Sequence, residues 1–205
     1  MTNLDCDYWF PTPIYRTMVS NYQELNKELL LLIREHKEKN EGIQGSNIQG
    51  YHSKSDLQWD PIAKVLCDTM RKIEQAEALT QPCELVELWY NINPPQSHNA
   101  NHTHPRCDWS GVYYIQTPEN SGMLHIDDPR DRAHMTLPKQ KPAKDISPML
   151  WRTTHYQPTP GMLLFFPSWL SHYPKPFSSG ERCVIVFDAR YNVDSSEINF
   201  NHTPI

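Results

Sequence analysis

The second half of the chain, from Glu84 to Asp188, is a succession of short β-prone segments, and this pattern restricts the fold more than any other feature. The segments rich in strand-forming residues are 85–92, 110–116, 123–127, 149–156, 162–166 and 183–188. The turn signals between them include Pro94-Pro95, Thr117-Pro118, Thr159-Pro160-Gly161 and Ser178-Ser179-Gly180. Short strands divided by proline and glycine turns are typical of a sandwich or a barrel.

Two amphipathic helices are expected before these strands. Asn21 and Glu24 have the spacing of a capping box, and leucines recur at helical spacing after them, which predicts a helix over 21–39. Asp60-Pro61 supplies an N-cap and a first-turn proline for a second helix that ends near Leu79. Helices followed only by strands indicate an α+β fold, mainly β, in which the two helices buttress the sheet.

The remaining segments of the first half are expected to be irregular or at an edge. The aromatic segment 8–15 contains two prolines, which cannot donate to a β-ladder, so it predicts a short edge strand. Segment 40–59 predicts a loop with one short strand at 48–52, and 139–148 predicts a second loop. We expect a single domain over 1–205, with the edge strand and helices in 1–80 and the β core in 84–191.

Composition excludes several classes of function. A chain of 205 residues suits one well-buried domain, and a net charge of -5 without a long basic run does not favour nucleic-acid binding. The first residues lack the features of a signal peptide, and no apolar run reaches the roughly 18 residues of a membrane span. Five cysteines without a CxxC pair favour reduced thiols, so we expect a cytoplasmic protein. The oligomeric state is not predicted.

His102 and His104 are the first candidates for a metal site. Side chains two residues apart on an extended segment project from the same face. A third imidazole, from His172, would complete one face of an octahedron and leave three positions for small ligands, as in non-haem Fe(II) oxygenases. Hydrogen-bonded surface histidines would explain the pair equally well.

Arg182 lies ten residues after His172, at the start of an apolar strand. Arg182, Val184, Val186 and Asp188 alternate on that strand, so they are expected to share its inner face. A buried arginine requires an anionic partner, and a ligand carboxylate bound through two hydrogen bonds would provide one. An exposed arginine at the strand edge is the alternative.

Together these residues resemble a known family. His102-Thr-His104, Ser110-Gly-Val-Tyr-Tyr114, Asp128-Pro-Arg130, the run from Pro160 to His172, and Arg182 are similar to the 2-oxoglutarate/Fe(II) oxygenases of bacteria and their phages. This group is related to the prolyl hydroxylases, and the resemblance covers about Leu85 to Tyr191. It implies a double-stranded β-helix, also called a jelly roll.

The resemblance also implies the cofactors and their ligands. His102, His104 and His172 would hold Fe(II), and Arg182 would bind the distal carboxylate of 2-oxoglutarate, assisted by Tyr114 or Ser110. The implied reaction consumes dioxygen, oxidises a C–H bond of an unidentified substrate and forms succinate and carbon dioxide. Substrate specificity is expected to lie in the loops 40–59 and 139–148 and in the helices.

His104 departs from the family pattern, since the wider superfamily has Asp or Glu at this position. Either His104 is itself a ligand, which we favour, or Asp108 or Asp128 supplies a carboxylate, or the site binds metal poorly. The three histidines also leave two other functions open. One is a thiol dioxygenase that uses three histidines without 2-oxoglutarate, and the other is a jelly roll that binds a metal or ligand without catalysis.

Overall fold

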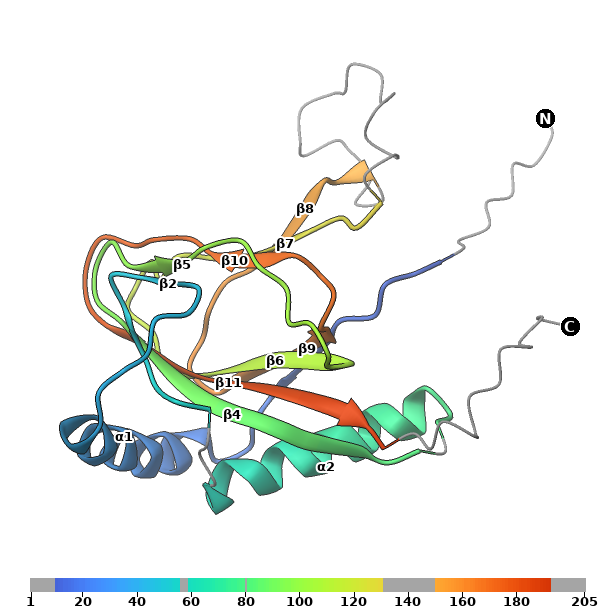
Figure 1. The fold of residues 1–205 in the computed structure, drawn as a ribbon, viewed down its shortest axis with the longest axis horizontal. Helices are drawn as coiled ribbons and strands as arrows, with labels where there is room; N and C mark the ends of the chain where they lie inside the picture. Colours follow the sequence, from blue (N-terminus) through green and yellow to red (C-terminus); the bar gives the residue numbers. More distant parts are fainter. Residues whose placement is uncertain (1–9, 56–58, 80, 131–149, 193–205) are drawn as a thin grey trace, which may run out of the picture.

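The computed structural model describes residues 10–55, 59–79, 81–130 and 150–192. Its two helices are α1 (Tyr22–Lys39) and α2 (Asp60–Ala76). Its strands are β1 (Tyr15–Met18), β2 (Asn47–Ile48), β3 (Tyr51–His52), β4 (Cys83–Asn93), β5 (His98–Asn99), β6 (Trp109–Gln116), β7 (Leu124–Asp127), β8 (Thr153–Tyr156), β9 (Met162–Pro167), β10 (His172–Pro174) and β11 (Arg182–Tyr191). Figure 1 shows three layers, with the helices below, a large sheet in the middle and shorter strands above.

The large sheet has six strands in the order β1-β9-β6-β11-β4-β3, and its neighbouring strands pair antiparallel. The strands above it form a three-stranded sheet, β10-β7-β8, and a two-stranded sheet, β2-β5. Two facing layers of antiparallel strands form the jelly roll predicted from the sequence, and the prediction of a mainly β fold with two helices is confirmed.

The central strands are buried on both faces because each face packs against a different layer. On β11, Cys183, Ile185 and Phe187 belong to the core shared with the helices. Val184 belongs to a second core, which contains Leu124 and other residues of the shorter strands. Alternation along each strand therefore sends one set of side chains to the helices and the other set into the jelly roll.

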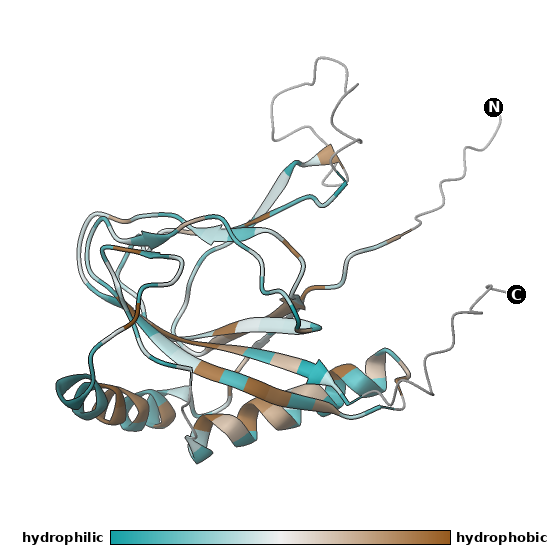
Figure 2. Cartoon of the chain, in the orientation of Figure 1, coloured by the Kyte–Doolittle hydropathy of each residue, from teal (hydrophilic) through white to brown (hydrophobic). Residues whose placement is uncertain are grey.

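The helices lie against the large sheet through their apolar stripes, visible as brown bands in Figure 2. Leu29 and Ile33 of α1 and Leu66 of α2 are almost completely buried in the shared core. A polar contact fixes the position of α1. The buried Asn26 donates to the carbonyl oxygen of Ile115 (2.7 Å) and accepts a hydrogen bond from the Tyr113 hydroxyl (2.6 Å).

The structure corrects three predictions at the ends of the helices. Asn21 has the left-handed backbone conformation (φ 54°), and its side chain makes no capping hydrogen bond, so the predicted capping box is wrong. In the second helix, Trp59 is the N-cap and Asp60 is already the first helical residue. That helix ends at Ala76, three residues before the predicted end at Leu79.

The short strands also differ from the predictions. The edge strand forms at Tyr15–Met18 instead of 8–15, since Phe10 to Ile14 lie outside regular structure and residues before them lie outside the described part. The strand predicted at 48–52 divides into β2 and β3, which join different sheets. The strands β5 and β10 were not predicted, and the predicted loop 139–148 lies outside the described residues.

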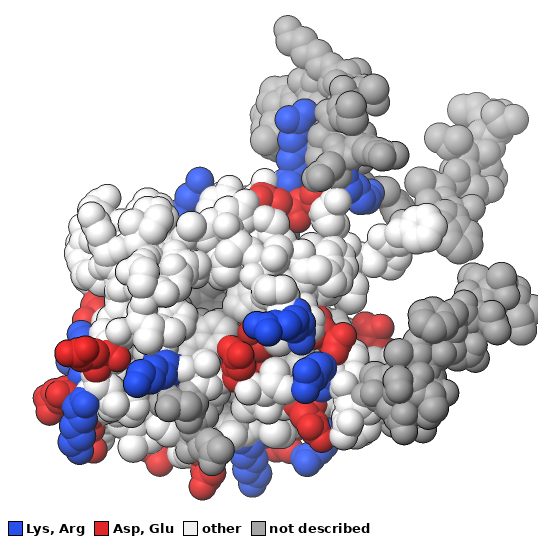
Figure 3. Space-filling view, viewed as in Figure 1, with Lys and Arg blue, Asp and Glu red and all other residues white. Residues whose placement is uncertain are grey.

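The surface offers no strong sign of an anionic or cationic partner on the face shown in Figure 3. Acidic and basic side chains are interspersed there, mainly over the helices and the ends of the long strands. Among the described residues, no helix combines the length and the apolar character needed to cross a bilayer.

Candidate active site

A single β-bridge brings the two parts of the proposed metal site together. The backbone amides and carbonyls of His102 and His172 are hydrogen-bonded to each other in both directions (3.1 and 3.0 Å). The amide of His104 donates to the carbonyl of Ser168 (2.9 Å). Residues 102–104 are thus extended beside β10 without being part of a longer strand. The imidazoles of His102 and His104 still come together, as the two-residue period of an extended chain predicts.

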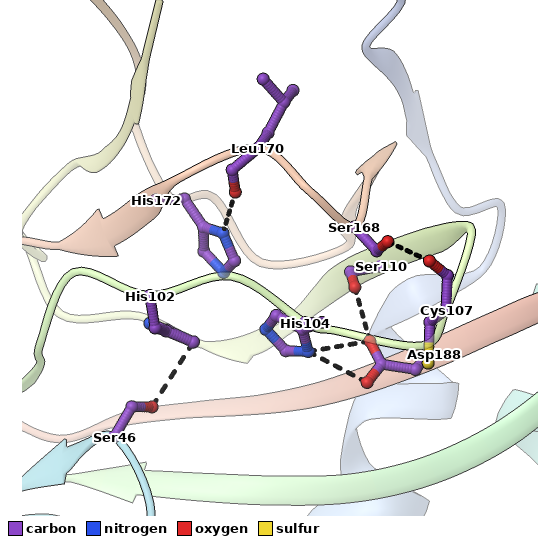
Figure 4. Close-up of polar contacts among 9 residues, drawn as sticks. All are labelled: Ser46, His102, His104, Cys107, Ser110, Ser168, Leu170, His172 and Asp188. Carbon is purple, nitrogen blue, oxygen red and sulfur yellow. Dashed lines mark hydrogen bonds and ion pairs between the residues drawn. The ribbon is translucent and has the colours of Figure 1, made fainter. Parts of the chain in front are cut away.

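The three imidazoles form a compact cluster, shown in Figure 4. One ligand atom from each of His102, His104 and His172 can be chosen so that all three lie within 4.8 Å of one another. The ring centroids are 4.4 to 5.1 Å apart. This spacing allows all three imidazoles to reach one metal ion.

Each ring is fixed through its Nδ1 atom. His172 Nδ1 lies 2.9 Å from the Leu170 carbonyl oxygen, and His102 Nδ1 lies 2.7 Å from that of Ala100. A carbonyl oxygen can only accept, so Nδ1 carries the proton in both rings and the lone pair of the neutral ring is on Nε2. The rings are therefore held in the tautomer that binds a metal through Nε2.

Burial keeps two of these histidines neutral. It lowers the pKa of His172 to about 3, and the neighbouring His102 contributes in the same direction. Burial likewise lowers the pKa of His102, and the proximity of His104 adds to the effect. Metal ions bind only the unprotonated imidazole, so both side chains are ready for coordination at neutral pH.

His104 is the histidine that occupies the expected carboxylate position, and it is bound to a carboxylate. Its Nδ1 lies 2.9 Å from Oδ1 and 3.0 Å from Oδ2 of Asp188. Its Nε2 is buried and has no hydrogen-bond partner in the described part of the chain. An unpartnered buried nitrogen beside two neutral imidazoles fits a metal ligand, and an all-nitrogen donor set suits Fe(II).

A cavity of about 530 Å³, including its open mouth, extends from the histidines into the jelly roll. His102 and His172 line it together with Arg182 and Tyr114. The predicted inner face of the last strand is observed, since Arg182 is only 2% exposed and Val184 and Val186 also line the cavity.

Arg182 is incompletely paired by the described protein residues. One terminal nitrogen donates to the carbonyl of Gly122 (3.0 Å), and the guanidinium lies over the ring of Phe177 (5.0 Å). The other terminal nitrogen is buried without a hydrogen-bond partner among the described residues. Burial removes the guanidinium from water and lowers the pKa of Arg182. An anionic ligand in the cavity would satisfy both the charge and the free nitrogen.

Strand β4 contributes a row of polar groups, and its two asparagines were missed from the sequence. Trp89, Asn91 and Asn93 alternate along the strand and line the cavity, and Asn93 pairs with Arg182 in the sheet. Trp89 Nε1, Asn91 Oδ1 and Asn93 Nδ2 are buried without a hydrogen-bond partner in the described residues. The available signal was the repetition of amides at alternate positions in a strand otherwise rich in apolar residues.

Tyr114 and Ser110, both on the inner face of β6, have different surroundings. Tyr114 lines the cavity with Arg182, and burial raises the pKa of Tyr114, so its hydroxyl stays protonated and able to donate. The Ser110 hydroxyl instead donates to Oδ1 of Asp188 (2.5 Å). We therefore retain Tyr114 as a candidate for 2-oxoglutarate binding and assign Ser110 to the support of Asp188.

Neither carboxylate considered from the sequence belongs to the histidine cluster. Oδ2 of Asp108 accepts a hydrogen bond from the backbone amide of Tyr191 (2.9 Å). Asp128 accepts hydrogen bonds from the backbone amide and the side chain of Arg130. The carboxylate at the site is Asp188, which the alternation along the last strand predicts on the inner face.

A second, wider groove meets the cavity at the histidines. It shares Ser46, Trp89 and His102 with the cavity and is also lined by His104 and Asp188. The Trp89 ring stacks on His104 (centroids 5.7 Å apart) and on His52 (5.5 Å). The cluster is therefore accessible from two spaces, one narrow with a buried cation and one broad.

Jelly-roll geometry, three convergent imidazoles and a buried arginine in the lining of the adjoining cavity fit a metal-dependent enzyme with an anionic co-substrate. Residues 87–188 match the family described as "Putative 2OG-Fe(II) oxygenase", where 2OG is 2-oxoglutarate. This match includes the three histidines, Arg182 and, as its last residue, Asp188. A search of curated proteins gave no significant match.

Solved structures agree with this class in their fold. A prolyl-4-hydroxylase from Pseudomonas putida is 16% identical, with a TM-score of 0.58 over 87% of this chain and 93% of that one. The viral collagen prolyl hydroxylase of Paramecium bursaria Chlorella virus-1, solved with 2OG, is 13% identical (TM-score 0.55, 85% and 95%). HygX from Streptomyces hygroscopicus, solved with nickel and 2OG, is also 13% identical (TM-score 0.58, 88% and 84%).

The chain belongs to the 2OG-Fe(II) oxygenases, which confirms the family resemblance found in the sequence. It is accordingly an oxidoreductase that uses Fe(II), 2OG and dioxygen.

Proposed function

We propose that this enzyme hydroxylates a C–H bond of its substrate, with His102, His104 and His172 as the metal ligands and Arg182 as the binding group for 2OG. The observation that carries the proposal is that one cavity joins a cluster of possible metal ligands to a buried cation without a full set of hydrogen-bond partners among the described residues. Imidazole nitrogens converge at the histidine cluster, and a buried, incompletely paired guanidinium lines the adjoining cavity. 2OG is a dianion that can bind a metal at one end and an arginine at the other.

The cavity residues would fix the orientation of 2OG. The free terminal nitrogen of Arg182 and the amide nitrogen of Asn93 would donate to the distal carboxylate, and Tyr114 would add a hydroxyl. Such charge-assisted hydrogen bonds in a site away from water are strong and directional. They would direct the keto-acid end of 2OG toward the histidines.

The substrate would approach through the second groove. This groove leads to His102 and His104, so a substrate there can reach the metal while 2OG fills the narrower cavity. When bound, iron and 2OG supply the oxidising chemistry, in which one oxygen atom of dioxygen enters succinate and the other enters the substrate hydroxyl, with release of carbon dioxide. The protein contributes ligation, orientation and exclusion of water.

The three-histidine donor set also favours a second candidate, a thiol dioxygenase that does not use 2OG. In that enzyme Arg182 would bind the carboxylate of a small thiol directly. The donor nitrogens of Asn93 and Arg182 that are unpaired in the described part of the chain belong to opposite residues of β4 and β11. They support the dianion, since its distal carboxylate can accept from both.

A turnover assay separates the two candidates. The metal-free protein is supplied with Fe(II) and air, once with 2OG and once with cysteine-like thiols, and both succinate and oxygen uptake are measured. We expect succinate formation that depends on 2OG and on His172. Oxygen uptake with a thiol, without succinate from 2OG, would contradict the proposed function and favour the thiol dioxygenase.

A further inference from the structure

Asp188 brings a negative charge next to the histidine cluster, although it is not among the possible metal ligands. Among the described residues, the group of possible metal ligands contains three imidazoles and no carboxylate. Three neutral imidazoles around a divalent ion leave an uncompensated charge in a buried place, and such burial is costly without a counter-ion. Asp188 is the acidic side chain in direct contact with the cluster, and it is only 4% exposed.

We propose that Asp188 is a positioning residue that holds His104 for metal binding and provides the negative charge usually supplied by a ligand carboxylate. The inference rests on the proposed metal site and adds a role for Asp188 and Ser110. In Figure 4, Asp188 lies on the side of His104 away from the other two rings, with dashed lines to His104 and Ser110.

The hydrogen bonds determine the orientation of His104. A carboxylate only accepts, so His104 donates from Nδ1 to Asp188, and Nε2 is the atom left for the metal. A metal-bound histidine is commonly oriented and made more basic by a carboxylate at its other nitrogen. His102 and His172 donate to backbone carbonyls instead, so His104 is the ligand that gains the most electron density.

The sheet holds Asp188 rigidly. Asp188 and Ser110 are opposite residues of β11 and β6, and the Ser110 hydroxyl donates to Oδ1 of Asp188 (2.5 Å). On its other side β11 pairs with β4 through a β-bulge, where the register shifts between Asp188 and Ala189. Bulges often redirect a side chain next to an active site. Asp188 is therefore anchored at the backbone and at its carboxylate.

This arrangement explains how His104 can replace the usual Asp or Glu while the site keeps its negative charge. The ion, its ligands and Asp188 together have the same total charge as an ion held by two histidines and one carboxylate. The negative charge is one imidazole further away, so the ion itself is bound by three neutral nitrogen donors. Metal affinity and the spectrum of the bound metal should both depend on Asp188.

The test is metal binding without turnover. Co(II) affinity is measured by competition with a chelator, together with the visible spectrum of the bound Co(II), for wild type, Asp188→Asn and a surface control, Asp68→Asn. The asparagine can still accept from His104 and hydrogen-bond with Ser110, so it removes mainly the charge. We expect an affinity loss of about 10- to 100-fold and a shifted spectrum for Asp188→Asn, with Asp68→Asn unchanged.

A double variant tests the charge directly. Replacing His104 by Asp moves a carboxylate to the metal, so His104→Asp combined with Asp188→Asn should bind Co(II) more tightly than Asp188→Asn alone. Wild-type affinity and spectrum in Asp188→Asn would overturn the proposal, and so would failure of the double variant to recover affinity. If Asp188→Asn does not fold, Ser110→Ala decides, because the proposal requires a smaller loss and shift in the same direction and an unchanged Ser110→Ala refutes it.

These outcomes are separate from those of the proposed function. A wild-type protein that binds no divalent metal would refute the metal site itself. A wild type that binds metal, combined with an unaffected Asp188→Asn, would refute only the role of Asp188.

Discussion

At the scale of single residues, Arg182 is the proposed binding group for 2OG. A guanidinium that is 2% exposed and retains an unpaired nitrogen among the described residues destabilises the empty protein. A bound dianion would remove that cost, so ligand binding and stability are expected to be coupled through this side chain.

Arg182→Met tests this coupling. The variant should bind 2OG at least about thirtyfold more weakly, since one partner of a buried charge pair is lost. Without ligand it should be no less stable than wild type, because an uncompensated charge has been removed. Calorimetry for 2OG affinity and thermal unfolding with and without 2OG measure both effects. Full 2OG affinity in Arg182→Met would exclude Arg182 as the binding group.

The buried histidines predict how stability depends on pH. The pKa of His172 is lowered to about 3 in the folded protein, from 6.5 for an unperturbed imidazole. The unfolded chain therefore takes up a proton below about pH 6.5 that the folded chain does not, so His172 stabilises the fold above that pH and this contribution is lost as the pH falls toward 3.

The measurement is denaturant unfolding of the metal-free protein between pH 7 and pH 5, in wild type and in His172→Asn. Below about pH 6, protonation of His172 in the unfolded chain should lower the free energy of unfolding by about 1.4 kcal/mol for each pH unit. The variant should lack this contribution. Equal slopes for the two proteins would show that His172 is not held neutral in the folded state.

At the scale of secondary-structure elements, the helices stabilise the sheet that carries the site. Residues of α1 and α2 share one core with the face of β4, β6, β9 and β11 that points away from the cavity. The opposite face of the same strands holds Asp188, Arg182 and the amides of β4. Packing of the helices thus supports these strands, and neither α1 nor α2 supplies a residue to the lining of the cavity or of the second groove.

Two leucines of α1 provide a matched pair of variants. Leu29 is fully buried against the sheet, whereas Leu31 is 64% exposed. Leu29→Ala should lower the free energy of unfolding by about 2–5 kcal/mol, and Leu31→Ala should change it by less than about 0.5 kcal/mol. Urea unfolding measures both, and similar losses in the two variants would contradict the observed orientation of α1.

Periodicity predicted the elements well where the strands and helices are long. Both helices and the long strands are present, since their apolar stripes and β-branched runs depend on local sequence alone. The strands β2, β5 and β10 have only two or three residues, too few for a periodic signal, and their pairing depends on distant partners. The left-handed conformation of Asn21 was not predicted by the capping pattern either.

The sequence indicated the histidines and the arginine that meet at the candidate site, but not the residues that support them. Spacing and resemblance indicated His102, His104, His172 and Arg182, and the alternation along β11 placed Asp188 on the inner face. The contact between Asp188 and His104 joins residues 84 positions apart and has no local signature. Its assignment required the observed register of β11 and β6.

At the scale of the whole molecule, the described residues form one layered structure. We propose that they fold as a single domain, because the helices and the large sheet share one core and the facing sheets share another. The site lies inside the jelly roll, where the bridge between His102 and His172 connects the short strands to the segment after β5. The layers therefore position the two ends of the cavity relative to each other.

The most direct test of the proposed Fe(II) and 2OG site is an anaerobic titration with 2OG. Metal-free protein is loaded with Fe(II), and 2OG is added while the visible spectrum is recorded. We predict a weak charge-transfer band that saturates at equimolar 2OG and requires His104 and His172. An iron-loaded protein that shows no band with excess 2OG would contradict the claim that the three histidines and Arg182 hold Fe(II) and 2OG together.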